Sequence, residues 1–265
     1  MGYKRIQIVI SLIVAFCLLL FPLPSLANEM KAIQERGYIK IAVKDNIRPL
    51  GFRDASGNLQ GLEIDLAQRL AQDLLGKPNA VKLQPVKNSD RIPQVLDNQV
   101  DLAIASVTAT KSRARLVNFS IPYYLDSAVL VTKNTSLQRL SDFKNQTIGV
   151  LLGSSTIPRI KYFIPNAKLT AVNSYREAQT QLETNQIEAF AADATVLSGW
   201  VQEYPQYRLL DIKLSTEPLC VVIAKGLQRD ELRRKIDNAL AQYLETGWLQ
   251  QRIKFWGLPP SRIRE

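Results

Sequence analysis

The stretch DLAIASVTATKSRARLVNFSIPYY, residues 101–124, decides how the rest of the sequence is interpreted. Its apolar run from Leu102 to Ala105 has the composition of a buried strand, and small hydroxyl side chains follow it directly. Arg113 lies one turn into a predicted helix. Hydroxyls, free N–H groups at a helix start and a guanidinium all bind carboxylates. The stretch therefore predicts a binding site for a small anionic molecule.

Short β-rich runs alternate with helical patterns along the chain. Strands are expected at 39–43, 81–86, 102–105, 147–152, 169–172 and 187–192. Between the first two, Leu62, Leu66, Leu70 and Leu74 recur every four residues and indicate a helix with one apolar face. The alternation predicts an α/β fold with largely parallel sheets, in which ligands bind beyond the carboxyl ends of strands.

Two segments of the chain resemble each other. Residues 96–106 read LDNQVDLAIAS and residues 182–193 read LETNQIEAFAAD. Each has a helix-like start, an Asn-Gln turn, an acid and then an apolar strand. Buried strands are alike in composition, which accounts for part of the similarity. The repeat nevertheless fits two lobes of similar construction, each ending a strand at a shared site.

The N-terminus has the layout of a secretory signal peptide. Lys4 and Arg5 precede an apolar run at 6–21, and the segment ends in Ser25-Leu26-Ala27. We expect residues 1–27 to be a cleaved signal peptide, which places the protein in the periplasm or otherwise outside the cytoplasm. The alternative is an uncleaved membrane anchor, because the run is near the lower length limit for a spanning helix.

The composition excludes several classes of site. The chain contains no histidine, which removes Ser-His-Asp and Cys-His nucleophile arrangements and imidazole zinc sites. Cys220 is the one cysteine after cleavage, so no intramolecular disulfide can form, and we expect a buried, inert thiol. The net charge is +10, but the basic residues are scattered, which disfavours nucleic acid. No cofactor, metal or catalytic residue is expected.

An ordered set of short motifs resembles the extracytoplasmic solute-binding proteins of polar amino-acid ABC transporters, bacterial solute-binding protein family 3. No single motif is specific, but the ordered set is. The motifs are GYIKIAV at 37–43, GFRDASG at 51–57, GLEIDLA at 61–67, RIP at 91–93, TATKSR at 108–113, FSIPYY at 119–124 and GVLLGSS at 149–155.

The resemblance implies a two-lobed periplasmic-binding-protein fold of type II, an α/β fold with two mixed or parallel sheets joined by two hinge strands. The lobes of this family close on the ligand. Here lobe 1 would comprise residues 28–127 plus 219–265, and lobe 2 residues 128–218.

The resemblance also implies ligand-binding residues in lobe 1. Arg113 matches the arginine that forms a paired hydrogen bond with the ligand's α-carboxylate, a geometry that lysine cannot reproduce. Thr108 matches the residue that adds a backbone N–H and a hydroxyl to the same carboxylate. Ser106 matches the residue whose carbonyl accepts from the α-ammonium group.

In lobe 2, the resemblance implies that Ser154, Ser155 and Thr156 face the carboxylate, although they also fit a helix N-cap. Asp193 matches the acid that pairs with the α-ammonium group across the cleft. An alternative role for Asp193 is the N-cap of the following helix.

Lys44 and Arg91 are the candidates for recognising the ligand's side chain. In relatives that bind cationic amino acids an aspartate occupies the position of Lys44, and aromatics occupy those of Ile47 and Asn88. Lys44 falls where glutamate and aspartate binders place a base, and NSDRIP at 88–93 approaches their NRIP element. Two cations would attract a side-chain carboxylate. The alternatives are that both side chains are solvated, or that Arg91 serves a neutral or sulfur amino acid.

The function implied is a non-enzymatic, monomeric receptor that takes a free L-amino acid to a membrane ABC permease, with glutamate or aspartate as the expected ligand. The alternatives are a receptor for glutamine, cystine or a neutral amino acid, and a stand-alone sensory module. A further alternative is an exported dehydratase of the same fold, in which Glu63, Glu217 or Asp193 could act as acid or base.

Overall fold

Two five-stranded sheets organise the protein in a computed structural model, which describes residues 29–152, 154 and 156–261. The first sheet has the order β5-β1-β6-β13-β7. Its strands are β1 (Ile39–Val43), β5 (Val81–Pro85), β6 (Leu102–Ile104), β7 (Val117–Asp126) and β13 (Glu217–Ala224). Strand β1 is parallel to β5 and β6, and β13 is antiparallel to β6 and β7.

The second sheet has the order β10-β9-β11-β8-β12. Its strands are β8 (Ala128–Thr132), β9 (Thr147–Leu151), β10 (Lys168–Val172), β11 (Ala189–Asp193) and β12 (Arg208–Leu209). Strand β9 is parallel to β10 and β11, and β8 is antiparallel to β11 and β12. The predicted α/β fold with two mixed sheets is confirmed. The sheets are not largely parallel, as the alternation of elements predicted, because β7, β8, β12 and β13 pair with their neighbours in antiparallel fashion.

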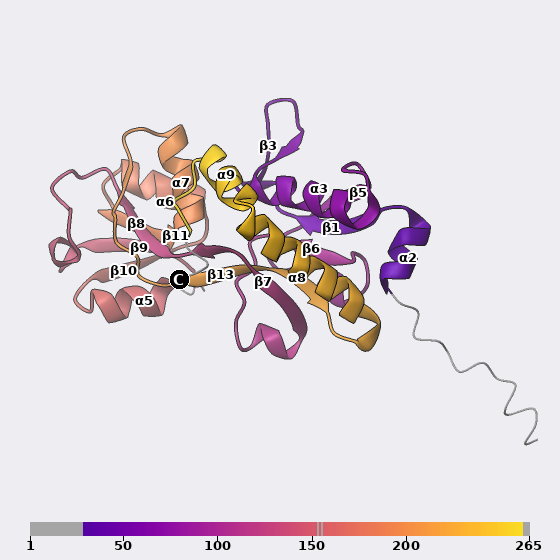
Figure 1. The fold of residues 1–265 in the computed structure, drawn as a ribbon. Helices are drawn as coiled ribbons and strands as arrows, with labels where there is room; N and C mark the ends of the chain where they lie inside the picture. The colour runs from indigo at the N-terminus through magenta and orange to yellow at the C-terminus, as the bar shows by residue number, and fades with distance from the viewer. Residues whose placement is uncertain (1–28, 153, 155, 262–265) are drawn as a thin grey trace, which may run out of the picture.

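The chain passes between the sheets twice. Strand β7 ends at Asp126 and β8 begins at Ala128; on the return, β12 ends at Leu209 and β13 begins at Glu217. Figure 1 shows the second sheet on the left, β1, β5 and β6 of the first on the right, and β7 and β13 running between the two groups. The lobe boundaries assigned from the sequence stay a prediction.

Helices cover the first sheet. They are α2 (Glu29–Arg36), α3 (Leu62–Leu75), α4 (Pro93–Leu96), α8 (Asp230–Glu245) and α9 (Trp248–Phe255). On α3 the predicted apolar face is buried at Leu62, Leu66 and Leu70, and Leu74 packs against the same core at its edge. Helix α3 begins after Gly61, whose φ is 128°; a Cβ there would lie 2.2 Å from the Leu50 carbonyl oxygen. Glycine is therefore required at this turn.

The second sheet carries apolar clusters on both of its faces. One cluster packs with α5 (Thr156–Phe163), and the other with α6 (Tyr175–Glu183) and α7 (Ala194–Glu203). Three short strands, β2 (Asn46–Ile47), β3 (Gly51–Arg53) and β4 (Leu59–Gln60), form a separate small sheet. The predicted helix at Arg113 is a short 3-10 helix, Arg113–Arg115.

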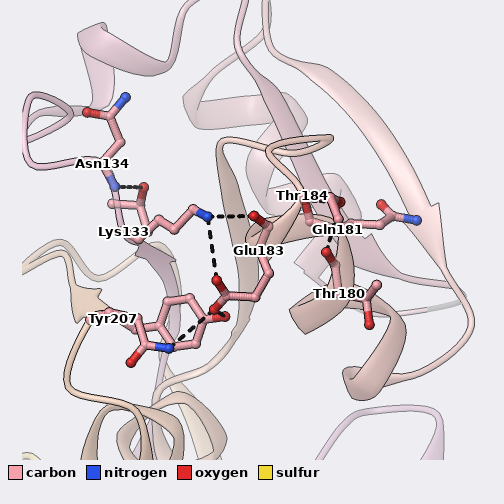
Figure 2. Close-up of polar contacts among 9 residues, drawn as sticks. Lys133, Asn134, Thr180, Gln181, Glu183, Thr184 and Tyr207 are labelled. Atoms are coloured by element: carbon pink, nitrogen blue, oxygen red, sulfur yellow. Dashed lines mark hydrogen bonds and ion pairs between the residues drawn. The ribbon is translucent and has the colours of Figure 1, made fainter.

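The C-terminal end of α6 is fixed to the second sheet by polar contacts around Glu183 (Figure 2). Lys133 Nζ donates to the Glu183 carbonyl oxygen at 2.8 Å and lies 3.6 Å from its carboxylate. The Tyr207 hydroxyl donates to the same carboxylate. These contacts set the position of α6, whose first residue, Tyr175, reaches the cavity described below.

Two further predictions concern the N-terminal segment and Cys220. The predicted signal peptide, residues 1–27, lies outside the described residues. Among the described residues, no helix has both the length and the apolar character needed to span a membrane. Cys220 is a free, buried thiol, as expected.

Candidate functional site

A cavity of about 370 Å³ is lined by residues that follow strands of both sheets. Ser106 comes two residues after β6, Ser154 follows β9, and Asp193 is the last residue of β11. Strands β6, β9 and β11 each have a parallel neighbour, and ligands bind beyond the carboxyl ends of such strands. The two similar sequence segments, which end at Ser106 and Asp193, thus meet at one cavity.

Six of the nine residues assigned from the sequence line this cavity. They are Arg91, Ser106, Thr108, Arg113, Ser154 and Asp193. Lys44 and Thr156 are not among the lining residues, and Ser155 lies outside the described part of the chain. A second hollow, of about 280 Å³, shares Ile47, Tyr175 and Val196 with the first.

Ser106 adopts a left-handed backbone, with φ 52°, and is held from both sides. Its N–H donates to Glu63 Oε1 at 2.6 Å, and its carbonyl oxygen accepts from Arg91 Nη1 at 2.6 Å. A non-glycine residue at positive φ is strained and persists only when its surroundings fix it. Glu63 and Arg91 therefore set how the backbone of Ser106 faces the cavity.

Glu63 is fully buried behind the cavity. Its Oε1 also accepts from the Tyr123 hydroxyl at 2.5 Å, and its Oε2 has no hydrogen-bond partner among the described residues. Burial raises the pKa of this carboxyl above its ordinary value. From the sequence, Glu63 was considered only as an acid or base of the dehydratase alternative and not as a support of the binding site. Its spacing from Leu66 and Leu70 puts an acid on the apolar face of α3, which is a signal that it supports a buried group.

Arg113 points a half-buried guanidinium at the cavity. Its Nη1 donates to the Thr108 carbonyl oxygen at 2.9 Å, and its backbone N–H donates to Thr110 Oγ1 at 3.3 Å. Within the described residues, Nε and Nη2 of this guanidinium make no hydrogen bond. The bond to Thr108 fixes the orientation of the guanidinium, and the remaining donors suit a carboxylate.

Asp193 stands at the N-cap position of α7, but its side chain makes no capping hydrogen bond. Asp193 therefore does not cap α7 with its side chain, which was the alternative role considered for it, and it lines the cavity instead. Burial, followed by repulsion from Glu217, raises the pKa of Asp193 to about 6. Glu217 lines the same cavity and was not among the ligand-binding residues assigned from the sequence.

Ser154 bonds to Thr156, the first residue of helix α5. Its Oγ accepts from the backbone N–H of Thr156 at 3.0 Å and donates to Thr156 Oγ1 at 2.8 Å. Thr156 is buried, so its hydroxyl supports the turn while Ser154 reaches the cavity. The capping considered for this segment thus takes the form of a side-chain bond to the first N–H of α5, at a helix start that lines the cavity.

Lys44 and Arg91, the two cations proposed for side-chain recognition, differ in position. Lys44 is only 3% exposed, and its Nζ donates to the Val86 carbonyl oxygen at 2.6 Å. Burial and the nearby Arg91 lower the pKa of Lys44. Arg91 lines the cavity, where its Nη1 also donates to the Ala105 carbonyl oxygen at 2.9 Å. Neither side chain is freely solvated, and only Arg91 faces the cavity.

Helix α7 also makes contacts outside this cavity, both with Arg48, in the loop between β2 and β3 of the small sheet, and with the segment that follows α9. Arg48 Nε lies 2.9 Å from Glu203 Oε1. A Cβ on Gly199 would lie 2.4 Å from the Arg48 carbonyl oxygen, so the close approach requires glycine. Gln202 Nε2 donates to the Trp256 carbonyl oxygen, just after α9, at 3.2 Å.

Comparisons with known proteins show the family and the fold to which this chain is similar. The model of the family "Bacterial extracellular solute-binding proteins, family 3" matches residues 39–259. The chain is 30% identical over 201 residues to the glutamine-binding protein of Geobacillus stearothermophilus, covering 75% of this chain and 77% of the relative. It is 24% identical to the glutamate-binding protein GluB of Corynebacterium glutamicum, covering 82% and 77%. Its fold is similar to that of an ancestral arginine-binding protein bound to glutamine, with a TM-score of 0.68, 29% identity, and coverage of 83% and 98%.

Proposed function

This chain belongs to the bacterial extracellular solute-binding proteins of family 3, and on that premise we propose that it is a receptor for a polar L-amino acid, with glutamine as the ligand that the cavity fits best. The observation that carries the proposal is that one cavity is lined by Arg113, which lies between β6 and β7 of the first sheet, and by Asp193, which ends β11 of the second. The guanidinium suits the α-carboxylate of an amino acid, and the carboxylate suits its α-ammonium group.

The charges that line the cavity favour a ligand without net charge. Arg91 and Arg113 contribute two cations, and Asp193 and Glu217 contribute two carboxylates. An amino acid with a neutral side chain is a zwitterion, so its binding leaves the net charge of the cavity unchanged. Because Lys44 uses its ammonium on the Val86 carbonyl and does not line the cavity, one of the two cations expected to attract a side-chain carboxylate is absent from the wall.

Glutamate is the second candidate, and Arg91 is the observation that favours it. Its guanidinium lies at the cavity with Nη2 unused by the described residues. That donor suits a side-chain carboxylate or the carbonyl oxygen of an amide. Both ligands have the same length, so the distinction between them is one of charge.

The remaining parts of the proposal follow from the family. Residues 1–27 act as the signal peptide that directs export. One lobe comprises residues 28–127 plus 219–265, and the other comprises residues 128–218. The receptor is a monomer that delivers its ligand to a membrane ABC permease. A ligand that contacts Arg113 and Asp193 bridges both lobes and therefore stabilises the closed state. We propose binding without turnover, since the cavity offers complementary charges to an amino acid and the chain has no histidine.

Titration calorimetry of the purified protein with each of the twenty L-amino acids tests this proposal. We expect saturable binding of glutamine, weaker binding of glutamate, and a melting temperature that rises with ligand concentration. Binding of arginine or lysine in preference to both would contradict the side-chain assignment. The absence of binding by every amino acid, or steady turnover of a prephenate-like or arogenate-like substrate, would contradict the receptor itself.

A further inference from the structure

Glu217 is the cavity residue whose carboxylate has no assigned task. It begins β13, on the return crossing between the sheets, and lies opposite Asp126 in the register of β13 and β7. Its side chain is partly buried and lines the cavity. Among the described residues it accepts no hydrogen bond and forms no ion pair. A carboxylate placed in this way is available to a positively charged group of a ligand that enters the cavity.

Asp193 reaches the same wall from the other sheet. It ends β11 opposite Ala128, the first residue of β8, and Ala128 follows Asp126 by two positions. The register of the two sheets thus brings Asp193 and Glu217 together beside the point where the chain crosses. Repulsion from Glu217 is the second cause, after burial, of the raised pKa of Asp193.

The other charged and titratable groups around Asp193 are accounted for. Asp126, at the end of β7, is buried and accepts from Thr195 Oγ1 at 2.5 Å; burial and Asp193 raise its pKa to about 7. Tyr175, at the start of α6, has its pKa raised to about 12 by burial and by Asp193. Arg91 acts in the opposite direction and lowers the pKa of Asp193, but donates to backbone carbonyls. Glu217 is therefore the neighbouring carboxylate left for a ligand.

We propose that Glu217 and Asp193 together hold the α-ammonium group of the ligand, one from each sheet. This inference rests on the proposed function and adds a residue to it. An ammonium group has three N–H donors and one positive charge, so it can donate to both carboxylates and relieve their repulsion. Arg113 takes the α-carboxylate, and the backbone of the amino acid is then held by three charged side chains.

The arrangement links binding to a proton. In the free protein the pKa of Asp193 is about 6, so part of the population is protonated at mildly acidic pH. The ligand's ammonium group favours the ionised form, so binding at such pH releases a proton. Affinity should therefore be constant well above pH 6 and fall as the pH is lowered through 6. Replacing Glu217 by glutamine removes repulsion, lowers the pKa of Asp193, and moves this fall to lower pH.

The test compares Glu217→Gln with wild type by calorimetry from pH 5.0 to 7.5, using the amino acid that binds most tightly in the screen above. We expect a loss of affinity of about tenfold or more at pH 7.5, because one charged hydrogen bond is lost. We also expect the fall in affinity to begin at lower pH than in wild type. Proton release is obtained by measuring the binding enthalpy near pH 6 in two buffers of different ionisation enthalpy. Wild type should release protons on binding under these conditions, and the Glu217→Gln variant should release fewer.

Glu188→Gln is the matched control, because it removes the same charge from a partly buried glutamate that lines a different hollow. It should retain wild-type affinity and pH dependence. Wild-type affinity in Glu217→Gln would overturn the inference, and so would weaker binding with an unchanged pH midpoint, which would mean that Glu217 acts only on structure. A wild-type protein that binds no amino acid would instead refute the proposed function.

Discussion

Replacing Arg113 by alanine should weaken amino-acid binding by about 100-fold or more while leaving the fold intact. The guanidinium is half-buried and bonds to the protein through Thr108, so the folded state loses little. The ligand's carboxylate, in contrast, loses a paired, charged hydrogen bond, each half of which is worth about 1.5–3 kcal/mol. Calorimetry at pH 7.5 measures the loss, and circular dichroism checks the melting temperature.

Two further variants make this result specific. Arg113→Lys keeps the charge but not the planar fork, and should bind more tightly than the alanine variant yet more weakly than wild type. Arg115→Ala removes an exposed arginine from the same 3-10 helix, outside the cavity lining, and should bind normally. If Arg113→Ala binds within about threefold of wild type, a difference too small for a charged hydrogen bond, Arg113 does not hold the carboxylate.

Replacing Glu63 by leucine should weaken both the fold and the site. The Ser106 N–H and the Tyr123 hydroxyl would lose their shared acceptor, and each buried donor left unpaired costs about 1–3 kcal/mol. We therefore expect the free energy of unfolding to fall by about 2–4 kcal/mol in urea titrations. Ser106 would also lose one of the two contacts that maintain its left-handed backbone, so affinity should fall by about tenfold.

Glu63→Gln separates hydrogen bonding from charge. The amide oxygen of the glutamine can still accept from Ser106 and Tyr123, so we expect Glu63→Gln to bind the ligand with most of the wild-type affinity that Glu63→Leu loses. Tyr243→Phe is the matched stability control, because the Tyr243 hydroxyl donates to the Asp73 carboxylate at 2.5 Å away from the cavity. It should lower stability and leave affinity unchanged. If Glu63→Leu binds as tightly as wild type at a temperature where it is folded, Glu63 does not position Ser106.

Local patterns in the sequence predicted six of the ten strands in the two large sheets and the general place of the site, but not the strands β7, β8, β12 and β13. The four-residue spacing of leucines at 62–70 indicated the buried face of α3, and the strand followed by hydroxyls at 102–108 indicated the end of β6. These signals depend only on neighbouring residues, because the spacing of apolar residues within one helix or strand indicates which of its faces is buried. Because parallel strands present their carboxyl ends at one edge, the position of a cavity followed from the same patterns.

Among the charged side chains, the sequence predicted that Arg91, Arg113 and Asp193 reach the cavity, but not that Lys44 turns away from it or that Glu217 lines it. Lys44 follows β1 as expected, but its ammonium is satisfied by the carbonyl of Val86, a partner 42 positions away along the chain. Glu217 lies at the start of a crossing strand, where no periodic pattern marks its direction. Tertiary contacts decide the direction of long side chains, and contacts of this kind are not encoded in the spacing of neighbouring residues.

The contacts of Arg48 with Glu203 and Gly199 have a consequence for selectivity. They hold the small-sheet loop against α7 without involving any residue that binds the α-carboxylate or the α-ammonium group. Under the proposed lobe closure, they contribute to the population of the binding-competent state before a ligand arrives, and apparent affinity scales with that population. Changes at Arg48 or Glu203 would therefore multiply the dissociation constants of all ligands by one common factor. The receptor's sensitivity to concentration can be adjusted there while its ranking of amino acids stays the same.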